Sequence, residues 1–307
     1  MEFYSAVIAI SSAALSSSVA LLLPSLGEGI SERAGVLNIG TEGYMISGAL
    51  AGYYGCLYTG HIWAGFLLGM LIGFLLSLIH AFLCVTLKTN QIVSGTGIWL
   101  LCTGLSAYVF RLVGQTSVVD KLKPVYFPIL SDLPIIGPVF FRHNLMVYIS
   151  LLLVPVCAFI LYRTPWGLLN KAVGDSPLAT DMAGHNVSVI RYVSVGICGA
   201  LAGLGGGYLA IGALSRFSEG LTAGKGFIAI AIVIFGRWDP IKILGGAIFF
   251  SLIDSIQLYL QAKGSIIPYP VLIIMPYLMT LIVLCATSRK AKDIPRRLGV
   301  PYFRGEE

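Results

Sequence analysis

Glu42 is an acidic residue inside a long apolar segment of the sequence. It follows Asn38 by four residues, about one helical turn, and has Gly40 and Gly43 on either side. A charge at the centre of a lone membrane helix costs roughly 2.5–3.5 kcal/mol on insertion scales, so such residues face a bundle interior or a watery cavity. We therefore expect Asn38 and Glu42 either to line a path or to brace a broken helix by bonding its free backbone groups.

Two further groups of polar side chains lie within or beside apolar segments. The stretch KTNQIVSGTG, residues 88–97, offers uncharged amide and hydroxyl groups. They belong to Asn90, Gln91, Ser94 and Thr96. Asp254 lies in FFSLIDSIQLYLQ, with Gln257 nearly one turn later. Neutral polar groups can bond solute hydroxyls and release them, so these residues are candidates for a solute pathway. Hydrogen bonding between helices is the alternative interpretation of the group at 88–97.

The residue types of common catalytic and metal sites are scattered. The four histidines and six cysteines show no C-x-x-C pair and no histidine at ligand spacing, so we expect no metal site and inert, buried thiols. No G-x-S-x-G or H-E-x-x-H motif supports an intramembrane enzyme. GLTAGKG, residues 220–226, is one residue too short for a Walker loop and has Gly226 where the hydroxyl should be. We expect the chain to hydrolyse no ATP and to bind no cofactor.

The composition indicates which elements must position these residues. Of the 307 residues, 57% are hydrophobic and the mean hydropathy is +0.87, which is more apolar surface than a soluble domain of this length can bury. A backbone in lipid must satisfy its own hydrogen bonds, and the segment lengths fit helices. We predict an all-α, polytopic membrane bundle of about nine (8–10) spanning helices, some broken or short. The predicted spans are 3–26, 36–58, 62–87, 92–112, 145–162, 189–214, 221–236, 241–262 and 268–287.

The distribution of Lys and Arg predicts an N-out, C-in orientation. With nine crossings, the cytoplasmic segments hold 13 of the 20 basic residues, while Lys225 is among those outside. Glu28, Glu32 and Arg33 fall in the first cytoplasmic connection, where a solvated turn is the simplest interpretation. The net charge of +6 is concentrated in the C-terminal tail, which indicates a cytoplasmic membrane flank rather than nucleic-acid binding.

We divide the chain into a transmembrane domain, residues 1–288, and a basic cytoplasmic tail, residues 289–307. Two long connections interrupt the apolar segments. Residues 113–144 contain four prolines and are expected outside the cell, whereas residues 163–188 are expected in the cytoplasm.

A short helix is predicted within the cytoplasmic connection. Ser176 can cap it, Pro177 fits its first turn, and Gly184 with Asn186 can end it after LATDMA. Such a helix has about two turns and no bilayer to cross. It is either an ordinary loop helix or a knob that a cytoplasmic partner contacts.

Four stretches of the chain together resemble one family of membrane proteins. They are GEGISERAGVLNIGTEGYMISGAL, NQIVSGTGIWLL, RTPWGLLNKAVGDSPLATDMAGHNV and LTAGKGFIAIAIVIFGRWDPIKILGGAIF, in this order. They resemble successive blocks of the permeases of ATP-binding-cassette (ABC) importers. The branch is the one for nucleosides and simple sugars, related to branched-chain amino acid permeases. The match extends from residue 20 to residue 260 and is greatest to the shorter of two paired nucleoside permeases.

The resemblance implies a set of partners. They are a second permease in a heterodimer, two cytoplasmic ATPases that bind ATP and Mg, and an extracellular substrate-binding lipoprotein, at the plasma membrane of a prokaryote. It also implies that the stretch around residues 171–184 docks the ATPase. The candidate coupling residues are Gly174, Asp175, Ser176, Pro177, Ala179, Thr180, Asp181, Ala183 and Gly184.

The leading functional hypothesis is therefore a permease subunit that moves nucleosides or a simple sugar by alternating access, driven by partner ATPases. The polar residues themselves suggest an uncharged, hydroxylated solute, and the nucleoside comes from the resemblance. The alternative is a proton- or sodium-coupled secondary transporter with Glu42 and Asp254 as ion sites. In the sequence, no basic partner is evident opposite these two acids.

Overall fold

The computed structural model describes residues 2–114, 118–120, 122–128, 130–264, 268–287 and 293–304. Within these ranges the fold is all-helical, with one isolated β-bridge between Pro124 and Asn144. The helices are α1 (Glu2–Arg33), α2 (Thr41–Thr59), α3 (Ile62–Ala81), α4 (Gln91–Val113), α5 (Ile136–Phe140), α6 (Leu145–Arg163), α7 (Pro165–Asp175), α8 (Pro177–Met182), α9 (Val187–Gly207), α10 (Lys225–Phe235), α11 (Pro240–Ala262) and α12 (Tyr269–Thr287). Two π-helical segments, η1 (Phe82–Thr86) and η2 (Tyr208–Ala213), extend α3 and α9.

Side-chain caps fix where several helices begin. Asn90, Asn144, Thr164, Asn186 and Asp239 each precede a helix and accept a hydrogen bond from a backbone N–H in its first turn. These bonds satisfy donors that the start of a helix leaves unpaired. Polar residues between the apolar segments thus determine the boundaries of the bundle.

The number of membrane-crossing helices is smaller than predicted. Each of the nine predicted segments contains helix, but in the described ranges six helices are long and apolar enough to cross a membrane. They are Tyr4–Arg33, Ile62–Thr86, Gln91–Val113, Leu145–Arg163, Val187–Ala213 and Pro240–Ala262. The count of about nine is therefore not supported. Since the structure contains no membrane, the N-out, C-in orientation stays a prediction.

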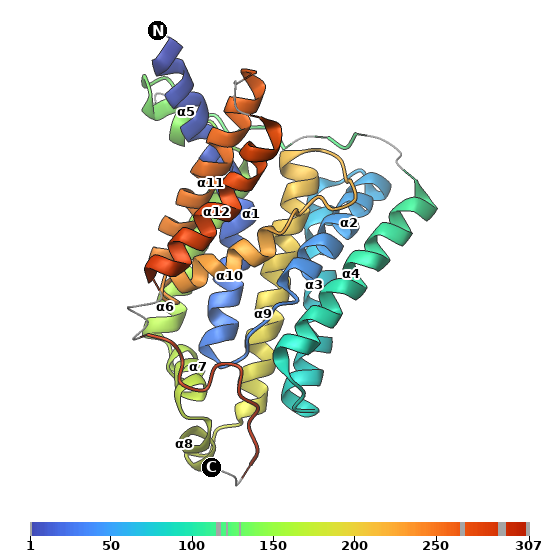
Figure 1. Cartoon of the computed structure of the whole chain (residues 1–307), viewed down its shortest axis with the longest axis vertical. Coiled ribbons are helices and arrows are strands. Elements are labelled where there is room, and N and C mark those ends of the chain that lie inside the picture. Colours follow the sequence, from blue (N-terminus) through green and yellow to red (C-terminus); the bar gives the residue numbers. More distant parts are fainter. Residues whose placement is uncertain are drawn as a thin grey trace.

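The predicted seventh span, residues 221–236, shows why the count differs. Its helix, α10, has 11 residues, which is about 16 Å, half of a hydrocarbon core of about 30 Å. Figure 1 shows α10 starting at mid-height in the bundle, preceded by a non-helical segment. Hydropathy alone does not separate such a half-length helix from a full span. The helix expected within residues 221–236 is present, but it is too short to cross a membrane.

Three glycines allow α2, α3 and α9 to pack closely. A methyl group added at Gly48 would lie 2.5 Å from the Cα of Gly203, and one at Gly69 would lie 2.8 Å from the carbonyl oxygen of Gly48. No side chain larger than hydrogen fits at this crossing. The glycine-rich stretch 199–213 therefore packs closely against α2 and α3 at Gly203.

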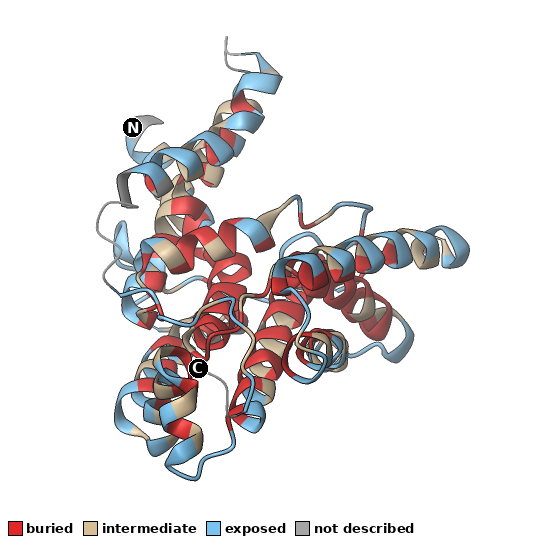
Figure 2. Ribbon diagram, turned by 60° about the horizontal axis from the view of Figure 1, so that its bottom comes forward, coloured by how far each residue is buried: buried red, intermediate tan, exposed pale blue. Residues whose placement is uncertain are grey.

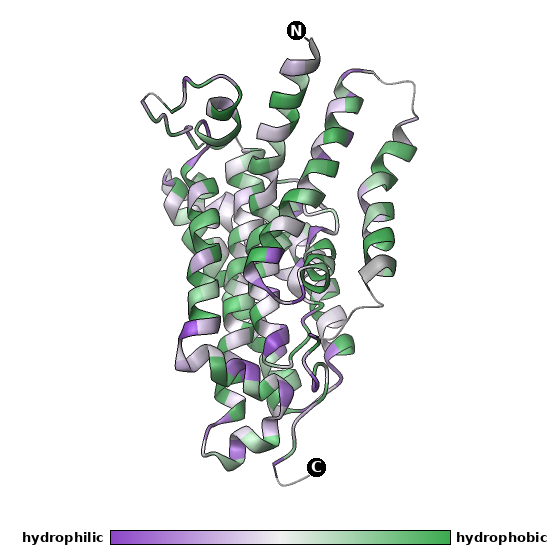
Figure 3. Cartoon of the chain, turned by 90° about the vertical axis from the view of Figure 1, so that its left-hand side faces the viewer, coloured by the Kyte–Doolittle hydropathy of each residue, from purple (hydrophilic) through white to green (hydrophobic). Residues whose placement is uncertain are grey.

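Burial and hydropathy describe a protein surrounded by lipid. Buried residues form the centre of the bundle and exposed ones its periphery (Figure 2). The exposed positions include large apolar side chains such as Leu67, Leu101, Leu152 and Leu281. Figure 3 shows that the outer faces of the long helices are largely apolar, and that hydrophilic residues gather toward one end. Six apolar helices and an apolar exterior are the features of a multi-pass membrane protein.

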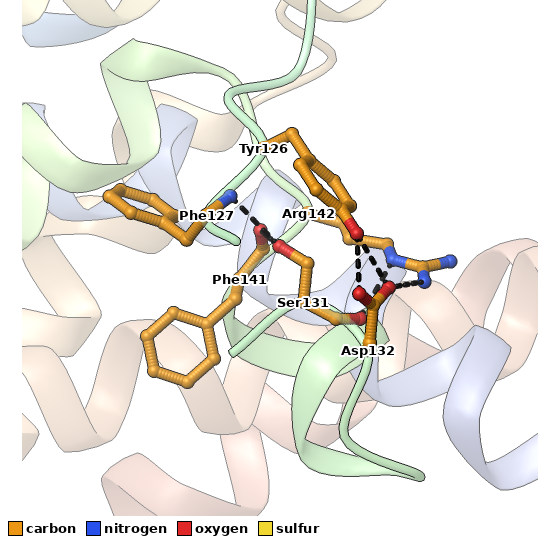
Figure 4. A network of polar contacts seen from close by, with 6 residues as sticks. All are labelled: Tyr126, Phe127, Ser131, Asp132, Phe141 and Arg142. Carbon is orange, nitrogen blue, oxygen red and sulfur yellow. Dashed lines mark hydrogen bonds and ion pairs between the residues drawn. The ribbon is translucent and has the colours of Figure 1, made fainter. Parts of the chain in front are cut away.

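The two ends of the bundle carry different elements. The N-terminus and α5 lie at one end, and α7, α8 and the C-terminus lie at the other (Figure 1). In the connection before α6, the Tyr126 hydroxyl donates to the Asp132 carboxylate at 2.6 Å, and Arg142 lies 3.5 Å from it (Figure 4). Arg142 Nε also donates to the carbonyl of Ser131 at 3.1 Å. The predicted long loop 113–144 is therefore an ordered cap in its described part.

Candidate functional site

Glu42 joins the beginning of α2 to the beginning of α10. Its carboxylate accepts hydrogen bonds from the Thr222 hydroxyl at 2.6 Å, the Gly224 N–H at 2.8 Å and the Gly226 N–H at 2.6 Å. Only 5% of Glu42 is exposed. These donors belong to the start of α10, where backbone N–H groups have no intrahelical partner and the helix dipole favours a negative charge. Of the two interpretations made from the sequence, the geometry favours bracing.

Gly226 is required for this close approach. A methyl group at Gly226 would lie 2.5 Å from the Cα and backbone nitrogen of Glu42. The two helix starts are thus in direct backbone contact, and the carboxylate closes over the donors. Both helices begin at the same level inside the bundle.

Glu28 organises the non-helical segment between α1 and α2. Its carboxylate accepts bonds from the Asn38 N–H at 2.9 Å, the Thr41 hydroxyl at 2.8 Å and the Cys198 thiol at 3.1 Å. The Asn38 side chain accepts a bond from the Tyr44 hydroxyl at 3.0 Å. Asn38, a candidate for the solute path, is fully buried and bonded within the protein.

The interpretation of Glu28, Glu32 and Arg33 as a solvated turn is wrong. All three lie in the last turns of α1, and Glu28 and Glu32 are 0% and 1% exposed. Trp238 Nε1 donates to Glu32 at 2.5 Å, while Arg33 Nε donates to the Trp238 carbonyl at 2.8 Å. The partner lies 206 residues away in sequence, so no local pattern reveals it. Trp238 has a φ of 57°, a strained value for a non-glycine residue that these contacts help to hold.

The polar group at the start of α4 holds the backbone of Leu37. The Leu37 N–H donates to Gln91 Oε1 at 2.8 Å, and its carbonyl lies 3.2 Å from His80 Nε2. The other ring nitrogen of His80 lies 3.1 Å from the Ser94 hydroxyl. Gln91, Ser94 and His80 are buried. The bonds from Gln91 and His80 satisfy the backbone of Leu37 within the non-helical segment, as non-helical backbone within a membrane requires.

The remaining candidates of that group also make local bonds. Asn90 caps α4, and the Thr96 hydroxyl donates to the Ile92 carbonyl at 2.8 Å. Asp254 differs, because its Oδ2 forms an ion pair with Lys225 Nζ at 2.9 Å. The sequence placed Lys225 in an outside connection and provided no cation for Asp254. The structure thus places Asp254 beside the first residue of α10 and leaves it separate from the group at 88–97.

The predicted loop helix is present as α8, Pro177–Met182. Ser176 occupies the N-cap position, but its side chain makes no capping bond. Gly184 ends the helix with a φ of +88°, where glycine is favoured, and Asn186 caps α9. The boundaries of α8 therefore agree with the prediction, but the predicted capping bond of Ser176 is absent.

Among the coupling-helix candidates, Gly174 connects α7 to α1, and Thr180 makes a local bond within α8. Gly174 packs against the carbonyl of Arg33 so closely that no Cβ fits between them. The Thr180 hydroxyl donates to the Ser176 carbonyl at 3.0 Å and is buried. The candidates that remain on the surface are Ser176, Ala179, Ala183 and Gly184.

The described part of the C-terminal tail packs on α7 and α8. The Arg297 N–H donates to the Gly174 carbonyl at 2.9 Å. The Asp181 carboxylate accepts bonds from the Tyr302 hydroxyl and from Arg304 Nε, both at 3.1 Å. Burial, followed by the bond to Asp181, raises the pKa of Tyr302, so its hydroxyl stays a donor at neutral pH. The tail and α8 border a hollow of about 420 Å³.

Comparison with known proteins identifies the chain as a transport subunit. Residues 10–284 match the family described as the permease component of branched-chain amino acid transport systems. The chain belongs to this permease family. Members of the family are transport subunits rather than enzymes, and the chain is a multi-pass membrane protein of the ABC-transporter permease class.

Three relatives cover most of the chain. The guanosine ABC transporter permease NupQ of Bacillus subtilis is 37% identical, over 93% of this chain and 93% of its own length. The nucleoside ABC transporter permease NupC of Lactococcus lactis is 34% identical, over 94% and 95%. TsgC13 of Haloferax volcanii, which carries the name of a glucose ABC transporter permease, is 42% identical, over 81% and 77%. No solved structure matches the chain.

Proposed function

We propose that this chain is one of two permease subunits of an ABC importer that carries nucleosides or simple sugars into the cell. The observation that carries the proposal is its similarity, over nine-tenths of its length, to permeases named for guanosine and nucleoside transport. Because another relative is named for glucose transport, we include simple sugars among the proposed solutes. A binding lipoprotein would deliver the solute, and partner ATPases would bind ATP and Mg.

We further propose that α8 is the site where an ATPase docks. Met182, at the end of α8, is 81% exposed, and Ala179 and Ala183 are also exposed. A protruding helix with a small apolar face fits into a groove of a partner protein. Asp181, on the adjoining face, is bonded to the tail, so the tail fixes the angle at which α8 is presented.

Force applied to α8 has a short route to the centre of the bundle. Asn170 of α7 is fully buried and donates to the Ile30 carbonyl of α1 at 3.2 Å and to the Ser194 hydroxyl of α9 at 2.7 Å. The last turns of α1 carry Glu28, which holds the start of α2. A shift of α7 would therefore be passed to the broken segment through buried hydrogen bonds.

The proposed orientation places α7, α8 and the tail in the cytoplasm. These elements share one end of the bundle (Figure 1), and the excess of Lys and Arg belongs to the same segments. The ordered cap around Tyr126 and Asp132 would then face outward, where a binding lipoprotein approaches. We do not propose an ion-coupled carrier, because the Glu42 carboxylate is occupied by three donors and Asp254 by Lys225.

Co-purification tests the ATPase partnership. The full chain, expressed with its partner subunits, should bring down an ATPase, and Met182→Asp should reduce the amount recovered because it puts a charge on the apolar docking face. Val118→Asp is the matched control, since Val118 is similarly exposed but lies in the opposite cap. Transport by the lone chain, with no ATPase bound, would contradict the proposal. Binding of guanosine, ribose, glucose and branched-chain amino acids to the extracellular partner would identify the solute.

A further inference from the structure

The ion pair between Lys225 and Asp254 lies inside the membrane-spanning part of the protein. Asp254 is in α11, one of the six helices that can cross a membrane, eight residues before its end at Ala262. Eight residues of helix correspond to about 12 Å, so the pair lies well within a hydrocarbon core of about 30 Å. Lys225 is the first residue of α10, which begins at mid-height (Figure 1).

The pair is open to its surroundings. The side chains of Lys225 and Asp254 are 20% and 23% exposed. Ionised groups that contact lipid at this depth are strongly disfavoured, and intramembrane charges face a bundle interior or a water-filled cavity. Residues of this chain that face lipid at a similar depth are apolar, as Leu152 of α6 is. The exposed face beside the ion pair is therefore a face that water reaches.

Aromatic rings continue the same face across the start of α10. The rings of Phe227 and Trp99 are perpendicular, with centroids 5.0 Å apart, and join α10 to α4. On the other side, the rings of Tyr277 and Phe227 both lie within 4 Å of a methyl group added at Gly224. The Tyr277 hydroxyl donates to the Ala223 carbonyl at 2.7 Å. Figure 1 shows α10 crossing the middle of the bundle beside α11 and α12.

We propose that Lys225, Asp254, Phe227 and Trp99 form a solute-contacting surface of the translocation path, specific for uncharged ring compounds that carry hydroxyl groups. The inference rests on the proposed function and extends it to named residues. The ion pair presents a donor and an acceptor side by side and has no net charge, so a charged solute gains nothing overall. Asp254 engages Lys225 through Oδ2, and its Oδ1 accepts from a solute hydroxyl. Phe227 and Trp99 pack on the flat face of a sugar or base.

Glu42 is not part of this surface. Its carboxylate lies behind the start of α10 and is buried by its three donors. The two acids that the sequence analysis named as pathway candidates therefore have different roles. Glu42 positions α10, and Asp254 contacts the solute. Trp99, Lys225 and Phe227 carried no signal in the sequence that pointed to a pathway.

Water accessibility tests the placement of the surface. Phe227→Cys is made in a Cys285→Ser background, because Cys285 is exposed and the other five cysteines are buried. In the assembled transporter in liposomes, a charged, membrane-impermeant thiol reagent should modify Cys at 227. Leu152→Cys is the matched control, exposed at mid-span on α6, and should not be modified. Equal, slow labelling at both positions would overturn the proposal, because position 227 would then face lipid or protein.

Solute protection tests the ligand class. Guanosine, adenosine and glucose are supplied separately at saturating concentration, with leucine, a zwitterion without a ring or hydroxyl group, as the comparison. One of the three hydroxylated solutes should slow the modification at 227. Labelling that none of them slows would overturn the solute contact but leave the permease assignment intact. Conversely, an ATPase that fails to co-purify would contradict the proposed function without changing the labelling at 227.

Uptake measurements test the role of the carboxylate. Asp254→Asn should lower uptake at a subsaturating solute concentration about tenfold, the factor expected for a lost hydrogen bond to a charged group. Glu219→Gln is the matched control, because it breaks an exposed ion pair with Arg111, in the last turn of α4. The amount of assembled transporter is measured for each variant. Uptake by Asp254→Asn equal to that of Glu219→Gln, at equal assembly, would overturn the contact.

Discussion

The Glu42 carboxylate, in the first turn of α2, accepts the backbone N–H of Gly226, in the first turn of α10, at 2.6 Å. One side chain thus joins two helices that both begin inside the bundle. In lipid no water is available to satisfy the free donors of a helix start. The contact allows a membrane protein to begin two helices at one level inside the bundle, which a transporter needs if its centre is to rearrange.

Replacing Glu42 by glutamine should destabilise the protein. Glu42→Gln keeps the size of the side chain but removes the charge and replaces one acceptor oxygen by an amide donor, which then faces a backbone donor. We expect a loss of about 1–3 kcal/mol in the free energy of unfolding, the cost of leaving a buried group unsatisfied. Thermal unfolding of the purified protein in detergent measures it. Glu219→Gln, at an exposed glutamate, serves as the control, and equal melting of the two variants would rule out the brace.

A methyl group at the crossing of α2 and α9 should also destabilise the protein. Gly48→Ala puts a carbon 2.5 Å from the Cα of Gly203, and overpacking of this kind costs about 1–3 kcal/mol. Gly97→Ala is the matched control, because Gly97 is also in a helix but has no atom within 4 Å of the added methyl. The ratio of folded to aggregated protein after heating in detergent compares them. Indistinguishable variants would mean that the helices can separate without loss.

The sequence predicted which segments are helical, because length and apolarity determine that choice in lipid. It also predicted the short helix at Pro177–Met182. It did not predict which helices cross, since α10 has the hydropathy of a span but only 11 residues. Helix length depends here on where Glu42 caps the chain, and that contact joins residues 184 apart.

The residues of the candidate site were predicted only in part, because their contacts also join residues that are distant in the sequence. Polar residues in apolar segments marked Asn38, Glu42 and Asp254 correctly as unusual. Their roles depend on partners distant in sequence, such as Lys225 for Asp254 and Gly226 for Glu42. A single sequence contains no record of such pairs. The distribution of Lys and Arg assigned Lys225 to an extracellular connection.

Removing the carboxylate of Asp181 should release the tail from α8. Asp181→Asn weakens the bonds to Tyr302 and Arg304 together, a loss of about 1 kcal/mol for each charge-assisted contact at a partly exposed site. Amide hydrogen exchange of residues 293–304 should therefore become several times faster. Asp132→Asn, in the opposite cap, is the control and should leave this exchange unchanged. Unchanged exchange in both variants would show that the backbone bond of Arg297 to Gly174 holds the tail alone.

The segment before α10 should become more mobile in acid, but only at a pH below the pKa of an ordinary glutamate. Arg111 Nε and Nη2 donate to the Glu219 carboxylate at 2.7 Å, and these bonds, together with the positive charge, lower the pKa of Glu219. A pKa that is lower in the folded state means that the ion pair contributes fully above the unfolded value, about 4.3, and that this contribution is lost as the pH falls through the lower folded value.

The solvent accessibility of a spin label, attached at neutral pH to a Ser218→Cys variant beside Glu219, measures this effect. We expect the accessibility of position 218 to be constant from neutral pH down to the pKa of a free glutamate and to rise only in stronger acid. Arg111→Gln should raise the accessibility already at neutral pH and remove the acid step, because no cation then holds the carboxylate. Both side chains are exposed, so added salt should reduce the difference between the variants. A step that survives Arg111→Gln would assign the acid sensitivity to another group.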